Sequence, residues 1–539
     1  MLYPAFPLKI LHLSRAKSLY NPEIKQLLMI NLEKELTLSE FQQVVFQRTR
    51  VELGVEARDR IIQSHQFLEK FSRNKIIYGV NTGFGPMAQY RVAEEDSVNL
   101  QLNLIRSHAT GAGAILSEVD VRALMLARLN TLSLGKSGID ISVAEVLIQL
   151  INLEITPLIF EHGGVGASGD LVQLAHLALV LIGEGEVFYQ GKRRDTEEVF
   201  RQKNIRPAKI TIREGLAIMN GTSGMTGLGL VNIVYAKQLL DWSVFCSSVI
   251  NEIVKAYDDH LSEELNQAKR HKGQQQIAKL MRNHLKDSGL TRSRKEEFYN
   301  TDHAKTELFK EKVQEYYSLR CVPQVLGPVM DTLSHSTKIL LEEVNSANDN
   351  PIIDVKTEQV YHGGNFHGDY ISLEMDKLRL VMTKTSMLAE RQINYLLNPK
   401  LNDILPAFVN ASKLGLNFGM QGAQFPAVST TAENQMLSNS MYVHSIPNNN
   451  DNQDIVSMGA NSAMMTRKVI NNCYEVLATE MATILQALYI LQYNDRLSSA
   501  TTLKIKDLKK IFRQIKEDRV LYKDIQNLKE YLKRHQAYD

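Results

Sequence analysis

Long helical stretches constrain the fold of this chain more than any other feature of its sequence. Apolar residues recur at helical spacing in the segments 225–256, 323–344, 370–397 and 461–493. Several of these segments are apolar on more than one side, as helices are when they pack inside a bundle. We therefore predict a mainly α fold with a long central helix bundle over residues 226–498.

The other segments complete the predicted domain organisation. Residues 36–225 combine a helical pattern at 119–134 with a β-like run at 186–189, which indicates a smaller N-terminal α+β part. A second β-like run spans residues 353–360. Residues 499–539 are predicted to form a C-terminal helical tail, whose many lysines are expected on a solvated helix face.

Composition limits the classes of function. Of 539 residues, 44% are hydrophobic and 23% charged, as in a soluble globular protein, and the net charge of +2 indicates no polyanion partner. The three cysteines lie far apart without CxxC spacing, which argues against a disulfide framework and a zinc cluster. No apolar run approaches the roughly 18 residues of a membrane span. We expect a cytoplasmic protein that binds neither nucleic acid nor membrane.

The run Gly-Gly-Val-Gly-Ala-Ser-Gly-Asp, which ends at Asp170, carries the most distinctive chemistry. A backbone this rich in glycine can bend until the amide nitrogen of Gly169 reaches the carbonyl carbon of Ala167. Attack there with loss of water closes a five-membered ring, and loss of the Ser168 hydroxyl leaves an electrophilic methylidene. A predicted helix over residues 170–182 begins directly after this turn with Asp170, and its N–H groups would help to hold the electrophile.

Four further segments accompany this turn along the chain. They read Tyr-Gly-Val-Asn-Thr-Gly-Phe-Gly from residue 78, Asn-Gly-Thr from 220, Tyr-Tyr-Ser-Leu-Arg-Cys from 316 and Gly-Gly-Asn-Phe-His from 363. Together the five segments closely resemble the aromatic amino acid ammonia-lyases, the family of histidine, phenylalanine and tyrosine lyases. The resemblance extends from Leu38 to Leu497. It is strongest to a group of bacterial tyrosine ammonia-lyases, through residues 78–90 and 442–458.

This resemblance implies a cofactor, an assembly and a set of site residues. The cofactor is a 4-methylideneimidazol-5-one (MIO) group formed autocatalytically from Ala167-Ser168-Gly169, without a metal. Family members begin near residue 36, so residues 1–35 are expected to be an extension, either a disordered arm or an artefact of the assigned start. A homotetramer is implied, with active sites that draw on three subunits. The resemblance assigns catalysis to Tyr78, Ala167, Ser168, Gly169, Tyr317 and Asn220, and substrate binding to Ser107, His108, Arg320, Gln314, Asn350, Phe366, Glu433, Asn449 and Gln453.

Two of these residues match demands of the implied reaction, the removal of ammonia from an aromatic amino acid. By resemblance Tyr78 takes the β-proton, although a phenol is a poor base unless burial beside positive charge lowers its pKa. Arg320 is assigned to the substrate carboxylate, which its planar fork matches with two parallel hydrogen bonds. Taken alone, such a tyrosine is more often a packing residue, and such an arginine more often forms a structural ion pair.

The substrate is predicted from two short segments. The imidazole in Ser107-His108 can hydrogen-bond either a phenol or an imidazole, whereas an apolar pair would suit phenylalanine. Ser-His is familiar from histidine lyases, but these usually carry Gln-Glu-Asp-His where this chain has Asn-Gln-Asp-Ile at 452–455. We predict conversion of L-tyrosine to trans-p-coumarate and ammonia. The alternatives are a histidine ammonia-lyase giving urocanate, an MIO-dependent 2,3-aminomutase, and a helical scaffold with a decayed site.

Overall fold

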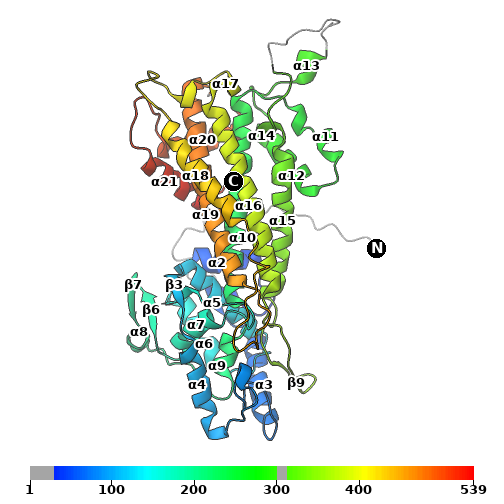
Figure 1. The fold of residues 1–539 in the computed structure, drawn as a ribbon, viewed down its shortest axis with the longest axis vertical. Helices are drawn as coiled ribbons and strands as arrows, with labels where there is room; N and C mark the ends of the chain where they lie inside the picture. The colour runs from blue at the N-terminus through cyan, green and yellow to red at the C-terminus, as the bar shows by residue number, and fades with distance from the viewer. Residues whose placement is uncertain (1–28, 300–311, 494, 539) are drawn as a thin grey trace.

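The computed structural model describes residues 29–299, 312–493 and 495–538. The molecule is elongated, with a long helix bundle at one end and a smaller α+β part at the other (Figure 1). The predicted mainly α fold is confirmed. No helix in the described ranges combines the length and the apolar character that crossing a bilayer requires.

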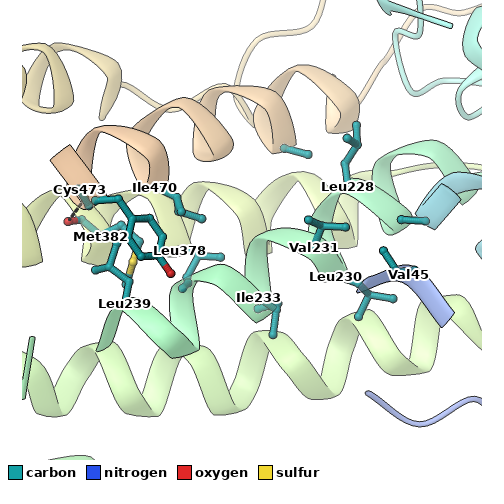
Figure 2. Packing of buried hydrophobic residues seen from close by; sticks show 14 of the residues in the cluster. Val45, Leu228, Leu230, Val231, Ile233, Leu239, Leu378, Met382, Ile470 and Cys473 are labelled. Atoms are coloured by element: carbon teal, nitrogen blue, oxygen red, sulfur yellow. Dashed lines mark hydrogen bonds between the residues drawn. The ribbon is translucent and has the colours of Figure 1, made fainter. Parts of the chain in front are cut away.

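Long helices form the bundle, and they begin and end within a few residues of the predicted segments. They are α10 (Ser223–Ile253), α15 (Val322–Val344), α16 (Asp369–Leu397) and α19 (Gly459–Leu491), and α18 (Gln421–Leu437) packs beside the last two. Figure 2 shows Leu239 of α10 close to Met382 of α16 and Cys473 of α19. All three side chains are buried. Burial of one such apolar side chain stabilises a fold by about 1.5–3 kcal/mol.

Shorter helices and small sheets form the N-terminal part. The helices are α2 (Leu38–Gln47), α3 (Val55–Phe71), α4 (Ser97–His108), α5 (Glu118–Ser133), α6 (Ile141–Asn152), α7 (Leu171–Leu181), α8 (Thr196–Lys203) and α9 (Glu214–Met219). The strand pairs are β1 (Met29–Asn31) with β2 (Arg50–Glu52), parallel, and β3 (Ala112–Ile115) with β5 (Phe160–His162), antiparallel. An antiparallel sheet joins β4 (Thr156–Pro157), β6 (Glu186–Tyr189) and β7 (Lys192–Asp195). These elements surround the glycine-rich turn, which lies between β5 and α7.

Two sequence-based expectations need correction or completion. The single β-like run predicted at 353–360 is a hairpin, because the chain turns between β8 (Ile352–Asp354) and β9 (Gln359–Tyr361). Of the expected extension 1–35, residues 1–28 lie outside the described residues. The rest of that segment is part of the fold, since Met29–Asn31 pair with β2 and the Leu32 side chain is buried.

The remaining short helices occupy the far end of the bundle and the C-terminal tail. They are α11 (Glu263–Gln267), α12 (Lys272–Leu285), α13 (Arg294–Phe298), α14 (Tyr317–Arg320), α17 (Pro399–Asn402), α20 (Ser499–Ile511) and α21 (Tyr522–Arg534). The chain's one tryptophan, Trp242, is fully buried on α10, and its indole N–H reaches the Leu532 and His535 carbonyls at 3.0 and 2.9 Å. Lys506 and Lys510 of α20 are exposed, as expected for a solvated lysine face, but Lys504 is an exception, because it is buried and donates to the Gln536 carbonyl.

Candidate active site

The glycine-rich turn between β5 and α7 depends on backbone conformations that favour glycine. Gly166 and Gly169 have φ of +76° and +74°. A Cβ atom at Gly169 would lie 1.9 Å from the Gly221 carbonyl oxygen, so no other residue fits there. The Ser168 carbonyl oxygen accepts a hydrogen bond from the Asn220 side-chain amide at 3.0 Å and lies 3.4 Å from the Gly221 nitrogen. The two glycine-containing motifs therefore meet at Ser168.

Asp170 precedes α7, but its side chain does not cap that helix. Its carboxylate instead accepts the amide of Met225, at 2.8 Å, in the first turn of α10. The carboxyl group is fully buried, and this burial raises the pKa of Asp170 to about 7 against the opposing effect of the amide hydrogen bonds. Asp170 thus joins the glycine-rich turn to the bundle. The sequence pattern of a helix start does not predict this contact, because the two segments are distant in sequence.

A pocket of about 750 Å³ opens beside Ser168. It brings together most of the predicted site residues: Tyr78, Ser107, His108, Ser168, Asn220, Asn350, Phe366, Asn449 and Gln453. Sequence reasoning missed Leu100, Asn103 and His362, which also line it. The two α4 residues could have been found from their helical spacing to Ser107. Ala167 and Gly169 lie in the turn itself, and both are buried.

Tyr78 lies at the start of a loop that we define as the Tyr78 loop, residues 76–92. Its phenol oxygen accepts a hydrogen bond from the backbone amide of Gly85 at 3.1 Å, and its ring packs edge-on against Phe84. No lysine or arginine is among the described residues that line the pocket. The Gly85 amide is therefore the donor beside the phenol oxygen, in place of the positively charged side chain that the sequence led us to expect.

His108 ends α4 in a defined orientation. Its Nδ1 lies 3.0 Å from the Leu104 carbonyl oxygen and 3.0 Å from the Ser107 hydroxyl. A carbonyl oxygen can only accept, so Nδ1 donates. In the neutral imidazole this leaves Nε2 as a hydrogen-bond acceptor at the pocket wall.

The segment 442–457 closes one side of the pocket, and we name it the closing loop. The Gln453 side-chain amide donates to the Ser168 hydroxyl at 2.9 Å. Asn449 lies against the Tyr78 loop, since a Cβ atom at Gly85 would meet its side-chain nitrogen at 2.6 Å. The closing loop therefore contacts both the reactive turn and the loop that carries the phenol.

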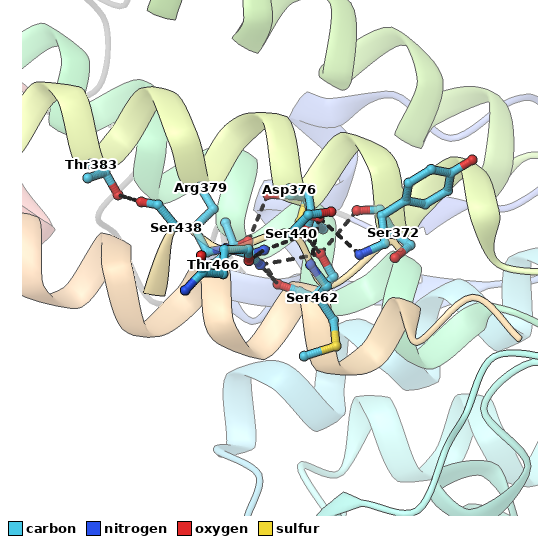
Figure 3. Close-up of polar contacts among 12 residues, drawn as sticks. Ser372, Asp376, Arg379, Thr383, Ser438, Ser440, Ser462 and Thr466 are labelled. Atoms are coloured by element: carbon cyan, nitrogen blue, oxygen red, sulfur yellow. Dashed lines mark hydrogen bonds and ion pairs between the residues drawn. The ribbon is translucent and has the colours of Figure 1, made fainter. Parts of the chain in front are cut away.

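Both ends of the closing loop are held by hydrogen bonds. Before its start, the Asp376 carboxylate on α16 accepts from the Ser440 hydroxyl at 2.7 Å and the Met441 amide at 2.8 Å (Figure 3). The same carboxylate accepts from the Ser462 hydroxyl of α19 at 2.6 Å. At its end, the Ser457 hydroxyl donates to the Gly166 carbonyl at 3.0 Å.

Four predicted site residues lie outside this pocket. Arg320 and Tyr317 are on α14, at the end of the bundle opposite α4 and α7 (Figure 1). The Arg320 guanidinium stacks on the Tyr317 ring at 4.5 Å and donates to the Gln314 side chain at 3.1 Å. Glu433 lies on α18, where it accepts from the Asn472 amide at 2.6 Å. Within a single chain, Arg320 therefore does not reach the pocket beside the glycine-rich turn.

Comparison with known proteins decides the family. The model of a family described as aromatic amino acid lyase matches residues 36–510. This chain belongs to that family. Its relatives include the MIO-dependent tyrosine 2,3-aminomutase of Streptomyces globisporus, 38% identical over 93% of this chain and 94% of that protein. Another is the histidine ammonia-lyase of Caldanaerobacter subterraneus subsp. tengcongensis, 38% identical over 91% and 93% of the two chains.

Comparison with solved structures indicates the same family. The tyrosine aminomutase of Streptomyces globisporus superposes with a TM-score of 0.89 at 36% identity, covering 94% of this chain and 97% of that one. Members of the family are ammonia-lyases and aminomutases, so the chain is an enzyme of this lyase type. Within the described residues, no group of three or more histidine, cysteine or acidic side chains is placed to hold a metal ion.

Proposed function

We propose that this enzyme is a tyrosine ammonia-lyase, which converts L-tyrosine to trans-p-coumarate and ammonia. We base this on one observation: the Ala-Ser-Gly turn, the Tyr78 phenol and the His108 imidazole meet at one pocket. The first supplies the cofactor, the second a base for the β-proton and the third an acceptor for the substrate's phenol.

The residues of the turn fit an MIO group formed from Ala167-Ser168-Gly169. Gly169 has the positive φ and the absence of Cβ that a tight cyclisation needs, and the Asn220 amide already binds the Ser168 carbonyl. The MIO group supplies an electrophile that activates the substrate's amine for departure. Asn220, which donates to the Ser168 carbonyl, would hold the group in place, and Phe366 at the pocket wall would exclude water from the reacting centre.

Tyr78 takes the β-proton as the amine leaves. The phenolate form of Tyr78 receives that proton and becomes the neutral phenol, while the Gly85 amide donates to the same oxygen and leaves lone pairs free. The closing loop, through Gln453 and Asn449, shields the same space from bulk water. The base is therefore placed and protected by backbone and amide groups.

His108 favours tyrosine over phenylalanine. Its Nε2 accepts a hydrogen bond, and the phenol of tyrosine donates one. Phenylalanine would leave that acceptor unpaired, which costs binding in a dry site. Histidine also carries a ring N–H, so it remains the second substrate to test.

We further propose a homotetramer in which other copies complete each pocket. Arg320, Tyr317, Gln314 and Glu433 do not line the pocket of their own chain, and in this assembly they would reach a neighbour's pocket, where Arg320 would bind the carboxylate. Apolar side chains exposed on the bundle support such packing: Tyr370, Leu373, Leu380, Phe425 and Met436. They would be buried between copies.

A 2,3-aminomutase is the second candidate. Relatives at 38% and 39% identity are named as tyrosine 2,3-aminomutases. Such an enzyme would use the same pocket but return the ammonia to the β-carbon, yielding β-tyrosine. This outcome needs a pocket that retains ammonia, and the hydrogen bonds at both ends of the closing loop favour retention.

The test is a side-by-side assay of the full-length protein with L-tyrosine, L-phenylalanine and L-histidine. We expect p-coumarate from tyrosine to form fastest, with β-tyrosine a minor product. Faster release of urocanate from histidine would reject tyrosine as the preferred substrate. An excess of β-tyrosine over p-coumarate would reject the lyase in favour of an aminomutase. Intact mass should be two water molecules below that of the unmodified chain, whereas Ser168→Ala should show no dehydration and no activity. An unmodified wild-type mass would reject the cofactor.

A further inference from the structure

Gln101 is a fully buried glutamine on α4 that does not line the pocket. Its side-chain nitrogen donates to the Gly79 carbonyl at 3.0 Å. Its side-chain oxygen accepts the backbone amide of Leu216, in α9, at 3.0 Å. The two partners have opposite hydrogen-bonding character, so the orientation of the Gln101 amide is fixed.

The bond to Gly79 has no counterpart in the Tyr78 loop. Among hydrogen bonds between described residues, only one other leaves residues 76–92, from the Asn81 side chain to the carbonyl of the adjoining Lys75, so the bond to Gly79 alone connects this loop to a distant part of the chain. The others, such as that from Gly79 to Thr82, close turns within the loop. Gly79 directly follows Tyr78 and has φ of +72°, and its α-carbon packs so closely on Leu216 that a Cβ would lie 2.2 Å from a side-chain methyl. Gln101 and Leu216 therefore hold Gly79, while Ile77 and Val80 are held by an apolar cluster with Leu68 and Ile353.

The second bond connects the same amide to the reactive turn. Leu216 is in α9, which ends at Met219, and the next residue, Asn220, donates to the Ser168 carbonyl. Gln101 also shares α4 with His108, seven residues further on, a separation of about 10 Å along a helix. Gln101, on the helix that ends at His108, thus contacts both the loop that carries Tyr78 and the helix that precedes Asn220.

We propose that Gln101 is a positioning residue that sets the place of Tyr78 relative to Ser168 and His108. This rests on the proposed function, since it assigns the β-proton to Tyr78. Proton transfer requires the base within hydrogen-bond reach of the carbon-bound proton, and a displacement of about 1 Å costs rate on the order of 10²-fold. Without the bond to Gly79, the loop keeps its internal turns but loses its hydrogen bond to α4.

The test compares Gln101→Met and Gln101→Glu in the full-length protein. Methionine preserves length and removes both bonds, whereas a carboxylate retains the Leu216 bond and cannot donate to Gly79. Gln486→Met is the matched control. Gln486 is equally buried in the bundle, donates to the Val409 and Ile515 carbonyls and accepts the Ile515 amide.

Three readouts separate positioning from folding. We expect kcat with tyrosine to fall by roughly 10–100-fold in both Gln101 variants while KM changes by less than about threefold. Hydrogen exchange of amides 77–90 should become at least about fivefold faster, with the bundle unchanged. Intact mass should still show full dehydration. The control should keep full dehydration, wild-type kcat and wild-type exchange in residues 77–90.

Several results would overturn the proposal. Unchanged exchange in residues 77–90, an equal effect in Gln486→Met, or a kcat loss that matches the undehydrated fraction would each do so. If Gln101→Met does not fold, Gln101→Glu alone decides through the same readouts. If wild-type protein turns over none of the aromatic amino acids, the proposed function fails, and the exchange measurement still tests whether Gln101 holds the loop.

Discussion

Neutral amide groups of the backbone and of side chains, rather than charged side chains of the same chain, donate to the atoms that would react. The Tyr78 phenol accepts from the Gly85 amide, and the Ser168 carbonyl is approached by the Asn220 side chain and the Gly221 amide. Such donors are fixed by the chain path and need no counter-ion. At this scale the chemistry depends on the conformation of a few residues in glycine-rich loops.

Replacing Tyr78 by phenylalanine tests this arrangement directly. The ring would still pack on Phe84, but the acceptor of the β-proton would be lost. Removal of a general base typically lowers the rate by about 10²–10⁴-fold. We expect the loss of kcat to lie at the upper end of this range, with KM mostly unchanged because the ring still packs on Phe84. Steady-state rates with tyrosine measure this, and a variant with wild-type kcat would show that another group takes the proton.

At the scale of helices and strands, periodicity predicted the elements well but not their contacts. The long helices α10, α15, α16 and α19 match the segments that their apolar spacing indicated. The hairpin of β8 and β9 was read as one run, because its turn carries no strong breaker. The carboxylate of Asp170 and the amide of Gln101 act on segments far away in sequence. No local pattern carries that information.

The packing of α12 against α20 predicts a dependence of stability on pH. The His284 ring of α12 packs edge-on against the Phe245 and Tyr538 rings and lies 2.8 Å from the Thr501 hydroxyl. Burial lowers the pKa of His284 from 6.5 to about 4. The folded state therefore binds fewer protons than the unfolded state between these values. The contribution of His284 to stability is complete above pH 6.5 and is lost as the pH falls to 4.

We expect His284→Gln to lower Tm at pH 7 and to reduce the further fall of Tm toward pH 4. Thermal unfolding of wild type and variant across this range measures the difference. The exposed His271, which precedes the first residue of α12, provides a control, His271→Gln, which should leave the pH dependence unchanged. Parallel Tm curves for wild type and His284→Gln would contradict the assignment.

The whole molecule holds the predicted site residues in two places. One group lines the pocket near the α+β part, whereas Tyr317 and Arg320 lie on α14 at the far end of the bundle and Glu433 lies on α18, outside the pocket. Motifs in sequence report that both groups are present. They do not report which copy of the chain supplies each, because subunit packing depends on surfaces that are distant in sequence.

Mixing two variants tests this division. Tyr78→Phe and Arg320→Lys should each be weakly active alone, since one lacks the base and the other the bidentate carboxylate site. If each pocket takes these residues from different copies, co-expression at equal levels should restore both in roughly a quarter of the sites. The activity of purified mixed oligomers measures this. Activity no higher than the sum of the separate variants would place both residues in one chain.

The burial of Trp242 has a practical consequence for spectroscopy. Since it is the one indole in the chain, intrinsic emission excited at its absorption edge comes from a single position, between α10 and the end of α21. A red shift of that emission would signal release of α21 from the bundle. The emission would not change with motions of the Tyr78 loop, which lies at the other end of the molecule.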